Sequence, residues 1–161
     1  MLFRSFWYVT VRNGLVTSKT DDVWHVDGFS MRTPHVPEQN YLLTNSFGTQ
    51  VLDQKIAVPE DFDAFKHNIH QYFQTVADER NTRTLDIDTV HCIDPYVVHR
   101  RNLQSENGYR KFIRISAIPI EIEDDTCVRN PLLPLKVYGR RDIRLNLVDY
   151  FTGKDLGGKL Y

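Results

Sequence analysis

Residues 24–28 read Trp-His-Val-Asp-Gly, and this short apolar segment guides the interpretation of the whole chain. Side chains alternate between the two faces of an extended strand, so His25 and Asp27 can present an imidazole and a carboxylate on one face. These are two of the three ligands of the 2-His-1-carboxylate triad, which binds non-haem Fe(II) and leaves coordination positions open. Because the chain contains 6 histidines, the triplet is a weak signal by itself, and its meaning depends on a second histidine further along.

The size and charge of the chain indicate one globular domain over residues 1–161. The net charge of −1 gives no strong nucleic-acid signal. No apolar run approaches the length of a membrane span, and residues 1–14 are too polar for a signal peptide. Cys92 and Cys127 lack a metal-binding spacing and are expected to be reduced thiols. We therefore expect a cytoplasmic protein with no membrane partner.

Short β-strands separated by turn signals dominate the predicted secondary structure. The first predicted strand, residues 6–12, is rich in β-branched and aromatic side chains and ends at Asn13-Gly14, a strong turn signal. The other predicted strands are residues 14–20, 22–27, 40–44, 49–52, 85–93, 96–100 and 111–122. A polar hairpin over residues 102–109 is expected to join the last two as neighbours in one sheet.

One segment, from Pro59 to Arg80, has a helical period instead. Its apolar residues recur every three or four positions, which predicts an amphipathic helix with Pro59 near its first turn. His67 and His70 are expected on the polar face of this helix. A second, short helix is predicted over residues 141–150.

Many short strands and one main helix predict a mainly β fold, an antiparallel sandwich or barrel. A jelly roll suits the strand spacing. An immunoglobulin-like sandwich is the alternative, but its Cys–Trp–Cys framework is absent from the sequence.

The second histidine ligand is expected on a late strand, because closure of a jelly roll brings early and late strands side by side. His99 follows an apolar run and precedes the basic pair Arg100-Arg101, of which at most one is expected to face inward. His91 is the alternative ligand. His99 is preferred because the next predicted strand carries an arginine suited to anion binding.

That arginine is Arg114, which shares one strand face with Ser116. An arginine facing into a barrel is costly unless it meets a counter-charge. A fixed guanidinium with a hydroxyl beside it is suited to bind a carboxylate. Arg110 is the alternative anchor on the same segment.

The ordered set His25-x-Asp27, His99 and Arg114-x-Ser116 resembles the core of the Fe(II)/2-oxoglutarate-dependent dioxygenases. The resemblance covers residues 6–122. Residues 130–134, Asn-Pro-Leu-Leu-Pro, are also similar to a segment of small phage and bacterial members. The resemblance implies a double-stranded β-helix, which is a cupin-like jelly roll, with the main amphipathic helix packed outside.

The resemblance also implies residue roles. His25, Asp27 and His99 would bind Fe(II), and Arg114 with Ser116 would bind the distal carboxylate of the co-substrate 2-oxoglutarate. Tyr41 is expected to supplement this anchor, with Tyr8 as the alternative. The implied reaction consumes O2 and converts 2-oxoglutarate to succinate while an organic substrate is oxidised. Members of this family that halogenate have a small residue in place of the carboxylate, so the presence of Asp27 implies hydroxylation or a related oxidation.

Two other functions are compatible with the sequence. One is a cupin-type metal enzyme that does not use 2-oxoglutarate, and the other is a non-enzymatic jelly-roll module for binding or structure. The substrate, a small molecule or a side chain, is not specified by these motifs. The chain is short for the family, so part of the substrate wall is expected to be absent or to come from a second subunit of a homodimer.

Overall fold

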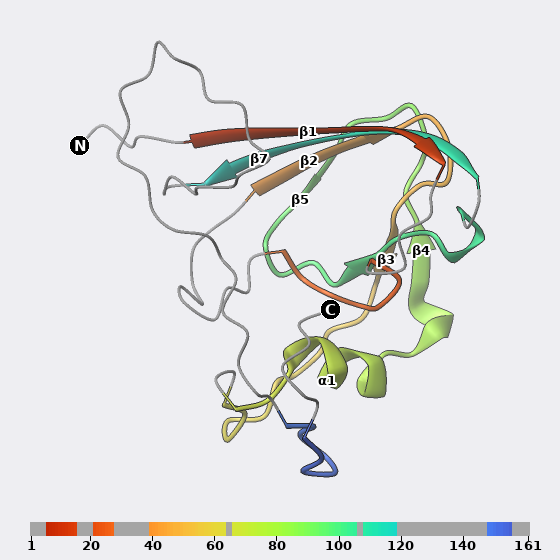
Figure 1. Ribbon diagram of the computed structural model, residues 1–161. Coiled ribbons are helices and arrows are strands. Elements are labelled where there is room, and N and C mark those ends of the chain that lie inside the picture. Colours follow the sequence, from red (N-terminus) through yellow and green to blue (C-terminus); the bar gives the residue numbers. More distant parts are fainter. Residues whose placement is uncertain are drawn as a thin grey trace.

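The computed structural model describes residues 6–15, 21–27, 39–63, 66–105, 108–118 and 148–155. Within these ranges the fold is mainly β, with two antiparallel sheets and one α-helix (Figure 1). The four-stranded sheet has the order β1 (Phe6–Leu15), β7 (Tyr109–Ile118), β2 (Gln39–Thr44) and β5 (His91–Ile93). The three-stranded sheet has the order β4 (Thr82–Thr84), β3 (Gln50–Leu52) and β6 (His99–Arg100). The helical elements are α1 (Ile69–Val76) and the short 3-10 helices η1 (Glu79–Asn81) and η2 (Leu103–Ser105).

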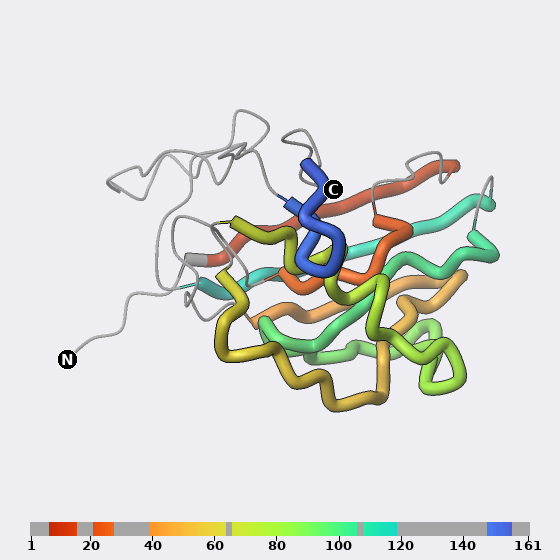
Figure 2. Tube along the Cα trace, turned by 90° about the horizontal axis from the view of Figure 1, so that it is seen from below, coloured from red at the N-terminus to blue at the C-terminus, as the bar shows by residue number. Residues whose placement is uncertain are grey.

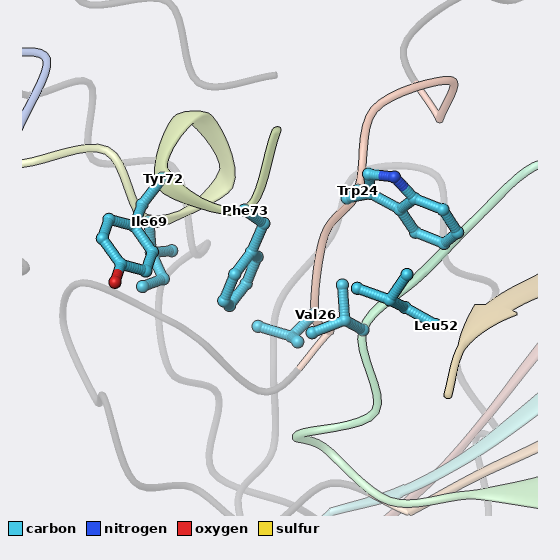
Figure 3. Close-up of a cluster of buried hydrophobic side chains, with 7 residues drawn as sticks. Trp24, Val26, Leu52, Ile69, Tyr72 and Phe73 are labelled. Atoms are coloured by element: carbon cyan, nitrogen blue, oxygen red, sulfur yellow. The ribbon is translucent and has the colours of Figure 1, made fainter. Parts of the chain in front are cut away.

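Two apolar clusters hold these layers together. Leu42 of β2, Val51 of β3 and Ile93 of β5 form a cluster that joins the two sheets. The second cluster joins α1 to the three-stranded sheet and to residues 24–26, and Figure 3 shows how its side chains meet. It contains Trp24, Val26, Leu52, Ile69, Tyr72, Phe73 and Val98. The three-stranded sheet is therefore covered by the larger sheet through one cluster and by α1 through the other.

Residues 148–155 cover part of this helical layer. Figure 2 shows this segment, in blue, beside α1 and the preceding chain. The ring of Tyr150 contacts the rings of Phe62 and Tyr72, and Phe151 stacks on Tyr72 with 5.4 Å between ring centroids. Of the predicted helix over residues 141–150, only residues 148–150 are described, and they form an isolated bridge and a turn. In the part of the chain that the structure describes, no helix is long and apolar enough to cross a membrane.

The main helix is much shorter than the prediction of residues 59–80. It begins after Asn68, whose side chain accepts hydrogen bonds from the backbone N–H groups of His70 and Gln71. Such a cap satisfies the N–H groups that a first helical turn leaves free, so it fixes the start of the helix. Among the described residues before Asn68, the N–H of Phe62 donates to the carbonyl of Pro59 and closes a separate turn.

Several predicted strands also differ from the structure. β1 continues through Asn13-Gly14 to Leu15, because β7 pairs with it along that whole length, so the predicted turn there is wrong. Residues 16–20, predicted to return antiparallel, lie outside the described residues, as do residues 119–122 of the last predicted strand. The predicted strand over residues 22–27 reduces to one bridge, between His25 and His99. The predicted strands 85–93 and 96–100 reduce to β5 and β6, and β4 was not predicted.

β6 and β7 are not sheet neighbours, contrary to the prediction. β6 pairs with β3 in the smaller sheet, and β7 lies between β1 and β2 in the larger one. His99 and Arg114 therefore lie on different sheets, and the predicted hairpin over residues 102–109 does not join neighbouring strands.

Arg100 and Arg101 are both buried, each with 7% of its surface exposed, so the expectation of at most one inward residue is wrong. Arg100 donates two hydrogen bonds to the Glu79 carboxylate and lies 4.0 Å from the ring centroid of Trp24. Arg101 pairs with Asp22 and donates a hydrogen bond to Ser105. Each guanidinium is compensated by a carboxylate, which makes its burial tolerable.

The first prediction concerns the pair of Glu79 with Arg100. Glu79→Gln should lower the free energy of unfolding by about 1–2 kcal/mol, because it leaves a buried guanidinium without its carboxylate while Glu79 itself is largely exposed. Urea unfolding measures this change. The control is Arg80→Gln, which breaks a solvent-exposed pair with Asp78 and should leave the free energy of unfolding nearly unchanged. Equal losses in the two variants would contradict the role given to Glu79.

Candidate metal centre

The structure brings His25, Asp27 and His99 together. One ligand atom from each residue lies within 4.8 Å of the others, which is close enough for one metal ion. His25 and Asp27 come from the segment after Asp21, and His99 begins β6. The sequence separation of these residues means that the tertiary fold, and not a local motif, assembles the cluster.

Backbone pairing sets the two histidines side by side. The N–H of His25 donates to the carbonyl of His99 at 2.9 Å, and the N–H of His99 donates to the carbonyl of His25 at 2.9 Å. Residues directly opposite each other in an antiparallel pair place their side chains on the same face. The imidazole centroids are accordingly 4.4 Å apart.

Hydrogen bonds to backbone carbonyls orient both imidazoles. Nδ1 of His25 lies 2.8 Å from the carbonyl oxygen of Val23, and Nδ1 of His99 lies 2.9 Å from that of Val97. A carbonyl oxygen only accepts, so Nδ1 carries the proton in each ring and Nε2 of the neutral imidazole is left with its lone pair. This is the usual arrangement of metal-binding histidines.

Asp27 supplies the negative charge of the cluster. Its Oδ2 accepts a hydrogen bond from Asn40 Nδ2 at 3.0 Å and lies 3.5 Å from His99 Nε2. Its Oδ1 accepts a hydrogen bond from Arg114 Nη1 at 3.3 Å. These contacts hold the carboxylate against the two imidazoles.

The predicted anion anchor lies beside this carboxylate. Arg114 and Ser116 are both on β7, on the face of the larger sheet that also carries Asn40. Ser116 lies directly opposite Asn40 in the register and donates its hydroxyl proton to Asn40 Oδ1. Ser116, Asn40 and Asp27 thus form a continuous hydrogen-bonded chain, with Arg114 at its metal-facing end.

Asn40 is a site residue that the sequence analysis missed, and it is fully buried. The prediction named Tyr41, its neighbour. Side chains alternate along a strand, so Tyr41 lies on the opposite face of β2 from Asn40 and is not brought to the cluster. Tyr8, the second choice for this role, lies opposite Ser116 across the β1–β7 pair and therefore shares the site's face.

His91 and Arg110, the second choices for metal ligand and anion anchor, make contacts away from the cluster. His91 lies outside the cluster of His25, Asp27 and His99, and its Nε2 contacts the carbonyl oxygen of Asp86 instead. Arg110 donates a hydrogen bond to Thr44 and lies 4.5 Å from the ring centroid of Phe112. Burial lowers the pKa of Arg110 to about 10.

His70 of α1 is a second residue that the sequence analysis missed, because the helical pattern predicts it on a polar face. Its ring lies edge-on to the ring of His25, with 5.9 Å between centroids. Its Nε2 is buried and has no hydrogen-bond partner among the residues described. Burial lowers the pKa of His70 to about 4, and the neighbouring His25 contributes to this lowering, against the opposing effect of Asp27. The apolar periodicity of the helix does not predict that His70 is buried, because this residue lies at the border of the apolar stripe.

The electrostatics of the cluster suit cation binding. Burial lowers the pKa of His99, and the nearby Asp27 carboxylate only partly opposes this effect. His99 is therefore neutral near pH 7, and a metal would not have to displace a proton from it. Two imidazole nitrogens and one carboxylate form a donor set that fits a divalent first-row metal.

A surface cavity of about 680 Å³ lies behind the strand that carries the ligands. Val26 and Val98, which line it, alternate with His25, Asp27 and His99 and so point to the other face. The cavity continues between β3 and α1, where Leu52, Ile69 and Phe73 line it. It therefore does not open onto the ligand atoms.

The second prediction concerns pH. His70 takes up a proton at pH 6.5 in the unfolded chain but only at about pH 4 in the folded one. Between these two pH values the unfolded state binds more protons than the folded state. The unfolding free energy of the metal-free protein should therefore fall as the pH drops from 6.5 to 4. His70 should contribute at most about 3 kcal/mol to this fall. Urea unfolding with a chelator present measures it. In His70→Gln this loss should shrink, and an unchanged pH dependence would contradict the assignment.

Comparison with protein-family models, with curated proteins and with solved structures finds no match to this chain. The interpretation of the centre therefore depends on its own geometry and donor set.

Proposed function

We propose that this protein is a non-haem Fe(II)- and 2-oxoglutarate-dependent dioxygenase with a double-stranded β-helix core, and that it hydroxylates an organic substrate. The observation that carries the proposal is the convergence of two groups of residues. The donor set His25, Asp27 and His99 lies within 4.8 Å, and the Arg114 guanidinium lies 3.3 Å from the Asp27 carboxylate. A three-ligand site beside a fixed cation suits an enzyme that binds a metal and an anionic co-substrate together.

The metal would be held by Nε2 of His25, Nε2 of His99 and the carboxylate of Asp27. When bound, Fe(II) supplies the capacity to activate O2 for oxidation, which no amino-acid side chain has. The contribution of the chain is orientation. The Val23 and Val97 carbonyls fix the imidazoles, and Asn40 fixes the carboxylate, before any ion arrives.

Arg114 would bind the distal carboxylate of 2-oxoglutarate. A guanidinium has five N–H donors, and the contact with Asp27 uses only Nη1. The side chain is 32% exposed, so it is accessible while still partly shielded from water. Ser116, two residues further along the same face, would support this anchor indirectly, because its one hydroxyl proton is donated to Asn40 Oδ1. Charge-assisted bonds from a guanidinium are stronger than neutral ones and favour a dicarboxylate over a neutral ligand.

Asn40 would connect the metal and co-substrate halves of the site. Its amide donates to Asp27 through Nδ2 and accepts from Ser116 through Oδ1. Because the residue is fully buried, loss of either bond would leave a polar atom without water. The position of the Asp27 carboxylate is thereby coupled to the position of β7, which carries Arg114 and Ser116.

The third prediction tests turnover. Purified protein with Fe(II), ascorbate and 2-oxoglutarate should form succinate slowly even without its substrate, through uncoupled decarboxylation. His25→Ala should lose this activity, because it removes a metal ligand. His91→Ala, a histidine outside the cluster, should keep it. Succinate formation no faster than in His25→Ala, over several conditions, would count against the proposed function.

The fourth prediction separates co-substrate binding from metal binding. Arg114→Gln should weaken 2-oxoglutarate binding to the Mn(II)-loaded protein by about 10- to 100-fold, since it removes a charge-assisted anchor. Its Mn(II) affinity should not fall, because Asp27 loses a competing cation. Titration calorimetry measures both. Arg110→Gln is the matched control on the same strand, and equal 2-oxoglutarate affinity in the two variants would rule out Arg114 as the anchor.

A further inference from the structure

The short segment that carries His25 and Asp27 has β-pairing on one edge only, among the described residues. Both backbone groups of His25 face His99 of β6. In an extended strand, the N–H and C=O groups of the adjoining residues point to the opposite edge. The backbone groups of Trp24 and Val26 therefore face away from β6. Trp24 is only 1% exposed, so its backbone groups need partners within the protein.

The side chain of Gln74 supplies those partners from α1. Its Oε1 accepts a hydrogen bond from the N–H of Trp24 at 3.1 Å, and its Nε2 donates to the carbonyl of Trp24 at 2.9 Å. One side-chain amide thus makes both hydrogen bonds that a residue of a neighbouring strand would make. Nε2 also donates to the carbonyl of His70 at 2.9 Å, which fixes the amide to its own helix.

Other contacts concentrate on the same short segment. The indole N–H of Trp24 donates to Glu79 at 3.1 Å, and Arg100 lies over the indole ring. His70, one helical turn before Gln74, contacts the ring of His25. Val26 and Phe73 belong to the same apolar cluster, which Figure 3 draws. The segment over residues 24–27 is therefore held between β6 on one edge and α1 on the other.

We propose that Gln74 is a positioning residue for the metal centre, and that its amide acts in place of a strand to fix the backbone that carries His25 and Asp27. On the β6 side this segment is held by one bridge and by a hydrogen bond from the N–H of Arg101 to the carbonyl of Asp21. On the opposite edge the two hydrogen bonds from Gln74 fix the backbone of Trp24. The claim that His25 and Asp27 bind a metal rests on the proposed function. The hydrogen bonds from Gln74 to Trp24 do not depend on it.

The first test uses metal-free protein and does not depend on any activity. In Gln74→Met, which has a similar shape and no amide, the backbone N–H groups of His25 and His99 should exchange with solvent about 10-fold faster or more. Gln71→Met is the matched control on the same helix, since no hydrogen bond from the Gln71 side chain to residues 24–26 occurs in the described structure. Amide exchange at His25 and His99 in this control should match that of the parent protein. Unchanged exchange in Gln74→Met would overturn the proposal.

The second test measures Mn(II) affinity by titration calorimetry, well below the unfolding temperature. Gln74→Met should bind Mn(II) about 10-fold more weakly than Gln71→Met, which is typical for loss of a residue that supports metal ligands. Equal affinities would overturn the positioning role while leaving the proposed function intact. If the parent protein binds no Mn(II), the proposed function fails and amide exchange alone decides whether Gln74 fixes the strand.

A further variant covers the case in which Gln74→Met does not fold. Gln74→Glu keeps the acceptor for the Trp24 N–H but removes the donor to the Trp24 carbonyl. It should speed exchange at His25 and His99 relative to the Gln71→Met control. Exchange equal to that control would overturn the proposal.

Discussion

The reciprocal pair of backbone hydrogen bonds between His25 and His99 is the interaction on which the candidate centre depends. It is an isolated bridge, not part of a long ladder, yet it brings two imidazoles to 4.4 Å and sets the face on which Asp27 lies. Much of the surrounding structure supports it. The carbonyls of Val23 and Val97 orient the rings, and Asn40 and Arg114 hold the carboxylate. Trp24 makes hydrogen bonds through its backbone and its indole N–H, and a guanidinium lies over its ring.

Local sequence rules predicted the parts of the fold and site that depend on strand alternation. His25 and Asp27 share a face, as do Arg114 and Ser116, because side chains two residues apart in an extended chain always do. The mainly β character, with one principal helix, also followed from residue patterns. The helix start did not, because the Asn68 cap sets the first turn well after Pro59. β1 similarly continues through Asn13-Gly14, because pairing with β7 overrides a local turn preference.

Residues that act across elements were not predictable from one sequence. Asn40 joins Asp27 to Ser116 only because β2 pairs with β7 in one particular register. The prediction of Tyr41 missed it by one position, which in a strand means the wrong face. Burial of Arg100 and Arg101 likewise depends on Glu79 and Asp22, carboxylates that lie far away in the sequence. The assignment of β6 and β7 to different sheets is a property of the topology that no local pattern contains.

The bridge between His25 and His99 also has a consequence for folding. It closes a long loop of chain, and long-range contacts form only after the entropy cost of that closure has been met. The donor set cannot exist in the unfolded chain or in a partly folded state that lacks this contact. An ion selective for the assembled site would therefore bind only molecules in which this contact has formed, and its binding rate after dilution from denaturant would report the closure of this loop.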